Sequence, residues 1–198
     1  MAFQVLSIAL SYLLGAVPFG LIFTKALSRV DIRTVGSGNI GATNVLRAAG
    51  KKAAVLTLLA DAVKGYLPVL IVNALFHDDP LTMLAGAAAI LGHNFPVYLK
   101  FKGGKGVATG YGIMLAVSPW IGLACLLAWL VAAYLWRYSS LSALVSFALY
   151  PLLTFAAALP DSRPEELLSL FLFGLIYYRH RENIKRLLAG AESKIGKP

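Results

Sequence analysis

Apolar residues fill long uncharged runs of this chain, and short clusters of charged residues, proline and glycine separate them. Those clusters bound seven runs. The runs are residues 3–24, 53–76, 81–99, 106–117, 119–136, 141–159 and 166–178. They do not alternate apolar and polar positions as barrel strands do. Because an open chain in hydrocarbon satisfies its backbone only as a helix, the pattern predicts an all-α fold of seven transmembrane helices.

The composition agrees with a membrane-embedded chain. Of the 198 residues, 59% are hydrophobic and 14% are charged, and the mean hydropathy is +0.74. These values are typical of an integral membrane protein, and no polar stretch is long enough to bury a separate core. We therefore expect a polytopic membrane protein with a single domain, residues 1–198. The single cysteine, Cys125, lies inside an apolar run, so neither a disulfide framework nor a paired-cysteine metal site is expected.

The charged residues sort onto two sides if each run crosses the membrane once. All of the 18 Lys and Arg residues except Lys64 and Arg163 fall on one side. The opposite connections carry the acidic residues Asp78, Asp79, Asp161, Glu165 and Glu166. The positive-inside rule makes the basic side cytoplasmic. The sequence thus predicts the N-terminus outside, the C-terminus cytoplasmic, and glycine-rich cytoplasmic loops.

The fourth run, residues 106–117, is short for a transmembrane helix. A helix of about a dozen residues is about 18 Å long, whereas the hydrocarbon core is about 30 Å thick. Either this helix extends into the preceding glycine loop, or that loop dips into the membrane and lines a polar cavity. An arrangement with five helices is the alternative topology.

The first polar segment on the predicted cytoplasmic side is VGSGNIGATNVLRAAGKK, residues 35–52. Its glycines permit positive φ and close backbone approach, while Ser37, Asn39, Thr43 and Asn44 offer side-chain donors and helix caps. If a helix begins near Asn39 or Thr43, its first N–H groups form an anion cradle. Arg47 then lies one turn after Thr43 on the same face. The alternative is a hydrophilic connector whose glycines only make turns.

The second polar segment is GHNFPVYLKFKGGKGVATG, residues 92–110. Its double glycine, Gly103 and Gly104, exposes backbone N–H groups between two lysines, which suits a phosphate. It is not a Walker A loop, because the G-x4-G-K-[ST] spacing is missing. The alternative is positive-inside anchoring by the lysines, which leaves the glycines and Thr109 without a role.

The third polar segment is YYRHRENIKRLL, residues 177–188, after the last apolar run. Its aromatic pair fits the interfacial belt of a membrane protein, and His180 and Asn183 stand among basic residues. Glu182 is the lone acidic residue of the segment, so we expect it to pair with a neighbouring cation. A generic amphipathic tail is the alternative.

Two ionisable residues, Asp61 and Lys64, lie inside the second run at i and i+3. Charges at that depth normally pair or line a cavity. We expect an ion pair that steadies the nearby site, with direct substrate binding by Lys64 as the alternative. The sequence offers no zinc-type His/Glu cluster and no Ser-His-Asp set. The polar groups therefore indicate anion binding, with no metal and no cofactor.

The quoted segments carry a family resemblance. SGNIGATNVLR and GHNFPVYLKFKGGKGVAT strongly resemble the bacterial acyl-phosphate-dependent glycerol-3-phosphate acyltransferases, and the stretch from His180 to Asn183 is similar to that family's third motif. The resemblance covers nearly the whole chain. It implies transfer of a fatty acyl group from acyl phosphate to the 1-hydroxyl of glycerol 3-phosphate, giving lysophosphatidic acid and phosphate, the first step of phospholipid synthesis.

The same resemblance implies a multi-pass protein of the bacterial inner membrane whose active site faces the cytoplasm. We expect the two substrates and membrane lipid as partners, no nucleic acid, and function as a monomer. The predicted catalytic residues are Ser37, Arg47, Lys105 and His180. The predicted substrate-binding residues are Gly38, Asn39, Thr43, His93, Asn94, Lys102, Gly103, Gly104, Gly106, Thr109 and Asn183.

Within this set, Lys105 and the backbone of residues 103–106 are expected to neutralise phosphate, helped by Arg47. His180, His93 or the phosphate of the substrate is the candidate proton acceptor. Ser37 as an acyl nucleophile is a competing mechanism, although no base is local to it in the sequence.

Two other functions compete with this one. An organic-anion transporter also uses intramembrane charges and broken helices, but the polar motifs here cluster on one side and no inverted repeat is clear. An acyltransferase with an acyl-CoA or acyl carrier protein donor is excluded only by the family resemblance.

Overall fold

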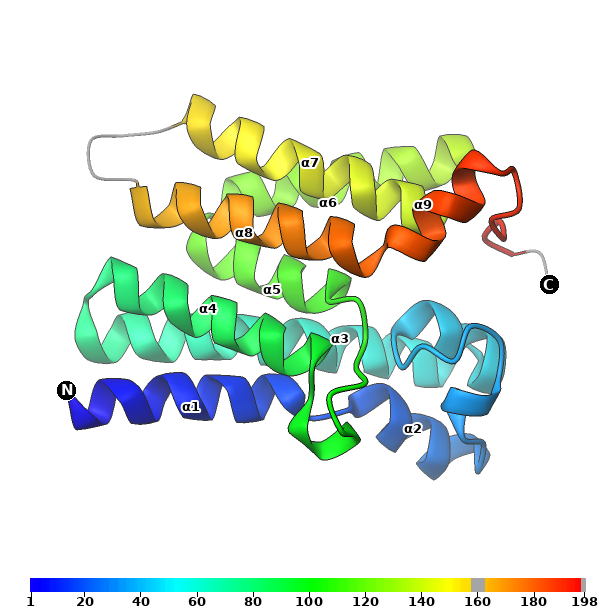
Figure 1. Cartoon of the computed structure of the whole chain (residues 1–198), viewed down its shortest axis with the longest axis horizontal. Helices are drawn as coiled ribbons and strands as arrows, with labels where there is room; N and C mark the ends of the chain where they lie inside the picture. The colour runs from blue at the N-terminus through cyan, green and yellow to red at the C-terminus, as the bar shows by residue number, and fades with distance from the viewer. Residues whose placement is uncertain (158–162, 197–198) are drawn as a thin grey trace. The chain divides into compact units, whose positions relative to one another are not determined.

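The computed structural model describes residues 1–157 and 163–196, and every regular element in them is a helix (Figure 1). The helices are α1 (Ala2–Ala16), α2 (Phe19–Ser28), α3 (Ala42–Phe76), α4 (Asp79–Asn94), α5 (Val107–Val117), α6 (Pro119–Trp136), α7 (Ser139–Ala156), α8 (Arg163–Arg179) and α9 (Arg181–Leu188). Two short 3₁₀ turns are η1 (Ile32–Thr34) and η2 (Val97–Leu99). The all-α prediction is confirmed.

The helices pack into two compact units, residues 1–116 and 117–198. The first unit contains α1 to α4 and nearly all of α5, and the second contains α6 to α9. The single domain expected from the sequence stays a prediction.

Four helical segments of the described residues are long and apolar enough to cross a membrane. They are Ala2–Ser28, Ala42–Phe76, Pro119–Trp136 and Ser139–Ala156. α5 is apolar but has only 11 residues. Large apolar side chains face outward, as lipid contact requires: Leu127 is 61% exposed and Trp120 is 83% exposed. These features support a polytopic membrane protein, while seven crossings and their direction stay predictions.

The first apolar run does not form one helix. α1 ends at Ala16 and α2 begins at Phe19, with Val17 at φ −59 and ψ 120 between them. Pro18 causes the break, because it lacks an N–H donor and disfavours helical geometry at the residue before it. The prediction of an unbroken helix over residues 3–24 was therefore wrong.

The second run starts, and the third run ends, at a different residue from the prediction. α3 begins at Ala42, well before residue 53, and Gly50 interrupts it at φ 80 and ψ −178. α4 ends at Asn94 and not at residue 99, because Pro96 keeps the residue before it out of helical geometry. The chain then turns through positive φ at Lys100 and Phe101.

The later runs agree better with the helices. α5 and α6 cover the fourth and fifth runs within a residue. α7 begins two residues before the predicted sixth run, and the predicted end of that run at residues 158–159 lies outside the described residues. α8 covers the seventh run, and α9 follows as a separate amphipathic helix.

Glycines allow the helices of the first unit to touch through their backbones. A Cβ on Gly15 of α1 would overlap the carbonyl of Ala89 in α4, and a Cβ on Gly92 of α4 would overlap that of Tyr12. Gly65 of α3 meets the carbonyl of Thr109 in the same way. Small residues are the usual interface of membrane helices, since no hydrophobic effect drives their association in lipid. These contacts fix the end of α4 and the start of α5 against α1 and α3.

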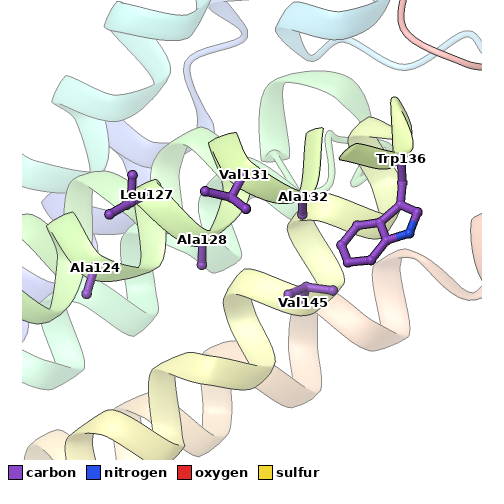
Figure 2. A pocket seen from close by; sticks show the side chains of 7 residues that line it. All are labelled: Ala124, Leu127, Ala128, Val131, Ala132, Trp136 and Val145. Atoms are coloured by element: carbon purple, nitrogen blue, oxygen red, sulfur yellow. The ribbon is translucent and has the colours of Figure 1, made fainter. Parts of the chain in front are cut away.

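The second unit presents an apolar groove between α6 and α7. Its volume is about 380 Å³, and its lining residues are Ala124, Leu127, Ala128, Val131, Ala132, Trp136 and Val145 (Figure 2). Beneath it, the Ser146 hydroxyl donates to the Cys125 carbonyl at 2.7 Å, and Cys125 is fully buried as expected. None of these lining side chains is ionisable.

Candidate active site

The first polar segment folds into a loop that Asn44 organises. Asn44 lies in the first turn of α3 and is buried. Its Oδ1 accepts from the Ser37 N–H at 3.1 Å, and its Nδ2 donates to the carbonyls of Val35 and Asn39, each at 2.9 Å. A Cβ on Gly36, which has φ +59, would overlap Asn44 Oδ1. The loop conformation therefore depends on one amide that was not among the predicted site residues.

The predicted residues of this loop divide into two kinds. Asn39 uses its Oδ1 to accept from the Gly41 N–H at 2.9 Å, so it shapes the entry to α3. Ser37, Thr43 and Arg47 are exposed. Within the described chain Arg47 has no acidic partner. An exposed guanidinium beside a helix N-terminus is suited to binding a phosphate.

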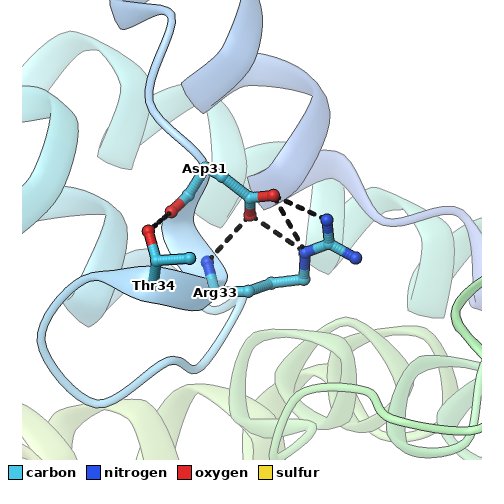
Figure 3. Close-up of polar contacts among 3 residues, drawn as sticks. All are labelled: Asp31, Arg33 and Thr34. Carbon is cyan, nitrogen blue, oxygen red and sulfur yellow. Dashed lines mark hydrogen bonds and ion pairs between the residues drawn. The ribbon is translucent and has the colours of Figure 1, made fainter.

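A second arginine near this loop, Arg33, has its positive charge balanced by an acidic neighbour. Asp31 caps η1 and accepts from Arg33 at 2.9 Å through Nε and at 2.6 Å through Nη2, while the Thr34 hydroxyl donates to the Asp31 carbonyl at 2.9 Å (Figure 3). Hydrogen bonds from Arg33 hold the pKa of the Asp31 carboxyl well below its usual range. Arg33 therefore differs from Arg47 in having its charge balanced locally.

The second polar segment folds back over the end of α4. The Gly104 N–H donates to the His93 carbonyl at 3.1 Å. A Cβ on Gly103 would overlap that carbonyl, and one on Gly104 would overlap the His93 imidazole. Gly106, at φ +87, approaches Asn94 Oδ1. Only glycines fit this path, because a Cβ at any of these positions would overlap the end of α4. The spacing of the glycines therefore reflects this close packing as well as the turns.

Two buried polar side chains beside this loop have no hydrogen-bond partner within the described residues. They are Asn94, through both Oδ1 and Nδ2, and Thr109, through its hydroxyl. Both side chains are completely buried. An unsatisfied buried amide costs about 1–3 kcal/mol, so such groups point to a site that receives a polar ligand. Both lie next to the first turn of α5, whose N–H groups attract anions.

The lysines of this loop differ in exposure. Lys102 is exposed, and Lys105 is half-buried two residues before α5. The ammonium of Lys105 therefore follows the double glycine at the point where the helix N-terminus also attracts negative charge.

The two loops of the first unit share one hydrophobic cluster. Ile40 and Val45 from the first segment pack in one cluster with Ile32 of η1, and Leu99 of η2 packs against it. Both segments therefore flank the same part of the unit. This proximity supports the convergence of the two loops, while direct approach of Arg47 and Lys105 stays a prediction.

The buried charges of α3 pair as expected. Lys64 Nζ lies 2.7 Å from Asp61 Oδ1, and neither residue is more than 3% exposed. Asp61 also faces His93 at the end of α4, with 3.7 Å between Oδ1 and Nδ1. α4 therefore ends beside the middle of α3.

The third polar segment belongs to the second unit, so its approach to the two loops stays a prediction. His180 is buried before α9, and its Nδ1 lies 2.8 Å from the Ile176 carbonyl. Because a carbonyl only accepts, that nitrogen carries a proton. Glu182 lies 3.3 Å from Lys185, which confirms its expected pairing.

Asn183 is held by a residue outside all three segments. Its Nδ2 donates to Glu192 Oε1 at 2.7 Å, and the same oxygen accepts from the Ser140 hydroxyl at 2.6 Å. Arg186 donates to Glu192 Oε2 at 2.7 Å. Glu192 thus ties the tail after α9 to the start of α7. Sequence reasoning missed it, although a lone glutamate in a basic tail was a usable signal.

Replacing Glu192 by glutamine is expected to destabilise the protein by about 2 kcal/mol, since three hydrogen bonds lose their charged acceptor. Burial raises the pKa of Glu192, but hydrogen bonds from Ser140, Asn183 and Arg186 outweigh it, and the net pKa is lowered. A lowered folded pKa gives stability that is present above the ordinary value of 4.5 and is lost as the pH falls through the folded pKa. Thermal unfolding in detergent between pH 6 and 3 checks this: the wild-type midpoint should fall more steeply than that of Glu192→Gln.

Comparison with known proteins gives one family throughout. The sequence model of the family described as "Glycerol-3-phosphate acyltransferase" matches residues 5–190. A glycerol-3-phosphate acyltransferase of Caulobacter vibrioides is 52% identical over 99% of this chain and 90% of its own length. One from Dinoroseobacter shibae is also 52% identical, over 94% of this chain and 90% of its own.

Two solved structures of a glycerol 3-phosphate acyltransferase are also similar to this chain. The crystal structure of PlsY, an integral membrane glycerol 3-phosphate acyltransferase, in its glycerol 3-phosphate form has a TM-score of 0.92 and 43% identity, and the match covers 98% of this chain and 96% of that chain. The lysophosphatidic acid form of PlsY matches with a TM-score of 0.90 and 42% identity, covering 98% of this chain and 95% of that chain.

Proposed function

Because this chain belongs to the glycerol-3-phosphate acyltransferase family, we propose that it transfers a fatty acyl group from acyl phosphate to the 1-hydroxyl of glycerol 3-phosphate. The products are lysophosphatidic acid and inorganic phosphate, and the reaction is the first step of phospholipid synthesis. The observation that carries the proposal is the glycine loop, residues 103–106, where buried polar groups without partners adjoin a helix N-terminus and Lys105. Binding of glycerol 3-phosphate to PlsY supports the same substrate here.

The glycine loop is the proposed phosphate site. Asn94 Nδ2 and the Thr109 hydroxyl donate to phosphate oxygens, together with N–H groups at the start of α5. Lys105 and Arg47 neutralise the charge. Gly38 and Thr43 are proposed to border the other side of this site, and the exposed Lys102 is proposed to add a cation at its entrance.

The proposed reaction is a direct displacement. The 1-hydroxyl oxygen of glycerol 3-phosphate attacks the acyl carbonyl carbon and forms the ester bond. The bond from that carbon to the bridging phosphate oxygen breaks, and inorganic phosphate leaves. Ser37 donates a hydrogen bond to the carbonyl oxygen as negative charge develops on it. Acyl phosphate is already activated, so the protein contributes mainly orientation and charge neutralisation.

The hydroxyl proton goes to a phosphate oxygen in this proposal. His180 is the protein's own candidate for that proton, with Asn183 held beside it in α9. Ser37 as a covalent nucleophile requires an adjacent base, and its only hydrogen bond within the described residues is made by its backbone N–H. No acyl-enzyme should therefore accumulate when the protein is mixed with acyl phosphate alone.

We further propose seven crossings of the bacterial inner membrane with the N-terminus outside, the C-terminus in the cytoplasm and the active site on the cytoplasmic side. The end of α4 beside the middle of α3 supports a glycine loop that dips into the membrane, which also accounts for the shortness of α5. A monomer suffices for this site.

The deciding experiment compares acyl donors on the purified protein. With glycerol 3-phosphate present, palmitoyl phosphate should yield equal amounts of lysophosphatidic acid and phosphate. Palmitoyl-CoA and palmitoyl-acyl carrier protein should yield no lysophosphatidic acid. Turnover with either thioester would refute the proposed donor. Absence of product with all three, together with glycerol 3-phosphate uptake into vesicles, would indicate a transporter instead.

Removing divalent metal ions with a strong chelator should leave the rate of acyl transfer unchanged. Cations for both phosphates are expected to come from lysine and arginine side chains, so no metal ion is needed to balance their charge. Initial rates with and without millimolar EDTA check this. A rate that falls with EDTA and returns with a divalent cation would contradict the assignment.

A further inference from the structure

A buried ion pair lies at the centre of the first unit, away from the exposed ends of the polar segments. Asp61 and Lys64 are 3% and 2% exposed, and their charged atoms are 2.7 Å apart. Removing two charges from solvent costs several kcal/mol per ion, and apolar residues of similar size often serve stability equally well. The pair is therefore poorly explained by stability alone, and its further contacts indicate what it does.

Lys64 reaches the break between α1 and α2. Its Nζ donates to the Val17 carbonyl at 2.9 Å and lies 5.6 Å from the centre of the Phe19 ring. The Val17 carbonyl precedes Pro18, where the regular helix hydrogen bonds stop. The Val17 carbonyl also accepts from the Phe19 N–H at 3.1 Å, so the ammonium is its second donor and ties the α1–α2 break to the middle of α3.

Asp61 reaches the end of α4. Its Oδ1 lies 3.7 Å from His93 Nδ1, which is ion-pair range and longer than a direct hydrogen bond. His93 is only 3% exposed and in turn supports the glycine loop at two points. Its carbonyl accepts from the Gly104 N–H at 3.1 Å, and its imidazole Nε2 lies so near Gly104 that a Cβ there would overlap it.

We propose that Asp61 and Lys64 are positioning residues for the phosphate loop. The Asp61 carboxylate orients the His93 imidazole, the imidazole forms the floor beneath Gly104, and Lys64 holds this assembly to the α1–α2 break. Neither residue touches substrate. The inference rests on the proposed function, because residues 103–106 are taken as the site that binds the phosphate of glycerol 3-phosphate.

The test removes both charges together. Asp61→Asn and Lys64→Met each leave one buried charge unpaired, so each single variant should lose both stability and turnover. The double variant leaves none, so its thermal unfolding midpoint should return close to that of the wild type. Its KM for glycerol 3-phosphate should nevertheless stay raised by about 10- to 100-fold, because the loop is no longer held in place.

A double variant with wild-type stability and wild-type KM would overturn the inference, since the pair would then serve stability only. Should the double variant fail to fold, Asp61→Glu decides. It keeps the charge opposite Lys64 but displaces the carboxylate by one methylene. A raised KM supports the inference, and a wild-type KM overturns it.

The connection through His93 has its own test. If Asp61 acts through the imidazole, Asp61→Asn should raise KM in the wild type but add little in a His93→Gln background. Additive effects would overturn the connection. Thr82→Val is the matched control, because it removes a buried hydroxyl from the opposite end of α4 and should leave KM unchanged.

Calorimetric titration with glycerol 3-phosphate distinguishes a failure of this inference from a failure of the proposed acyl-phosphate donor. A wild-type protein that binds glycerol 3-phosphate but does not react with palmitoyl phosphate refutes the donor, and the dissociation constants of the variants still decide the inference. A wild type that does not bind glycerol 3-phosphate overturns both.

Discussion

Replacing Lys105 by alanine is expected to lower kcat/KM by about 1,000-fold, equivalent to about 4 kcal/mol of transition-state stabilisation. Lys105 is half-buried two residues before α5, next in the chain to Gly106, which approaches the buried amide of Asn94. In such a partly dehydrated site a fixed ammonium interacts with phosphate far more strongly than in water. Phosphate release from palmitoyl phosphate with glycerol 3-phosphate measures the loss.

Lys100→Ala is the matched control, because it removes the same charge from the same connection. Lys100 is exposed and follows η2, three residues before Gly103. Its loss should change kcat/KM by less than about threefold, since exposed charges are well screened. Both variants should elute as single, monodisperse species. Equal losses in the two would mean that the loop supplies only general positive charge, and the phosphate-site assignment would be wrong.

The fold could be predicted where the apolar pattern decides it. α6 covers the predicted run because proline and charge bound a uniformly apolar stretch at both ends. The break at Pro18 was not predicted, although proline inside a run removes a helix hydrogen bond. The break at Gly50 was not predicted either, because an isolated glycine is tolerated within many helices. Gly50 is exposed and a Cβ there would meet no neighbouring atom, so the break rests on the positive φ of 80 that glycine adopts without strain, and no packing contact marks it.

The candidate site was predicted at the level of segments, and less well at the level of contacts. The glycines and cations of the two loops gave the anion-binding interpretation. Asn44 was named only as a donor and helix cap, and Glu192 was not named at all; the folded chain shows that Asn44 makes four side-chain hydrogen bonds and Glu192 accepts three. Asn39, predicted to orient substrate, also shapes the backbone of its own loop.

The buried ion pair illustrates the same limit. The i, i+3 spacing of Asp61 and Lys64 predicted their pairing, and the structure confirms it. The spacing could not indicate His93 or Val17, because these lie on α4 and at the α1–α2 break. Local spacing predicts contacts within one helix, whereas the contacts that link the pair to the glycine loop depend on glycines that bring helix backbones together.

Replacing Arg47 by alanine is expected to lower kcat/KM by about 1,000-fold, because it removes a guanidinium that neutralises phosphate charge in the transition state of acyl transfer. Arg47 is exposed in the first turns of α3 and has no acidic partner within the described residues. Arg47→Lys should recover only part of the loss, because an ammonium keeps the charge but not the two parallel N–H donors of a guanidinium. Steady-state kinetics with both substrates varied gives these values.

Arg33→Ala is the matched control for Arg47, since the two arginines border the same loop and differ in their partners. Asp31 balances the charge of Arg33 through hydrogen bonds of 2.6 and 2.9 Å, so little of that charge is available to a phosphate. Its removal should leave kcat/KM within about threefold of wild type, as expected for an exposed pair. Full activity in Arg47→Ala, or equal losses at both positions, would remove Arg47 from the site and leave the glycine loop to bind phosphate without it.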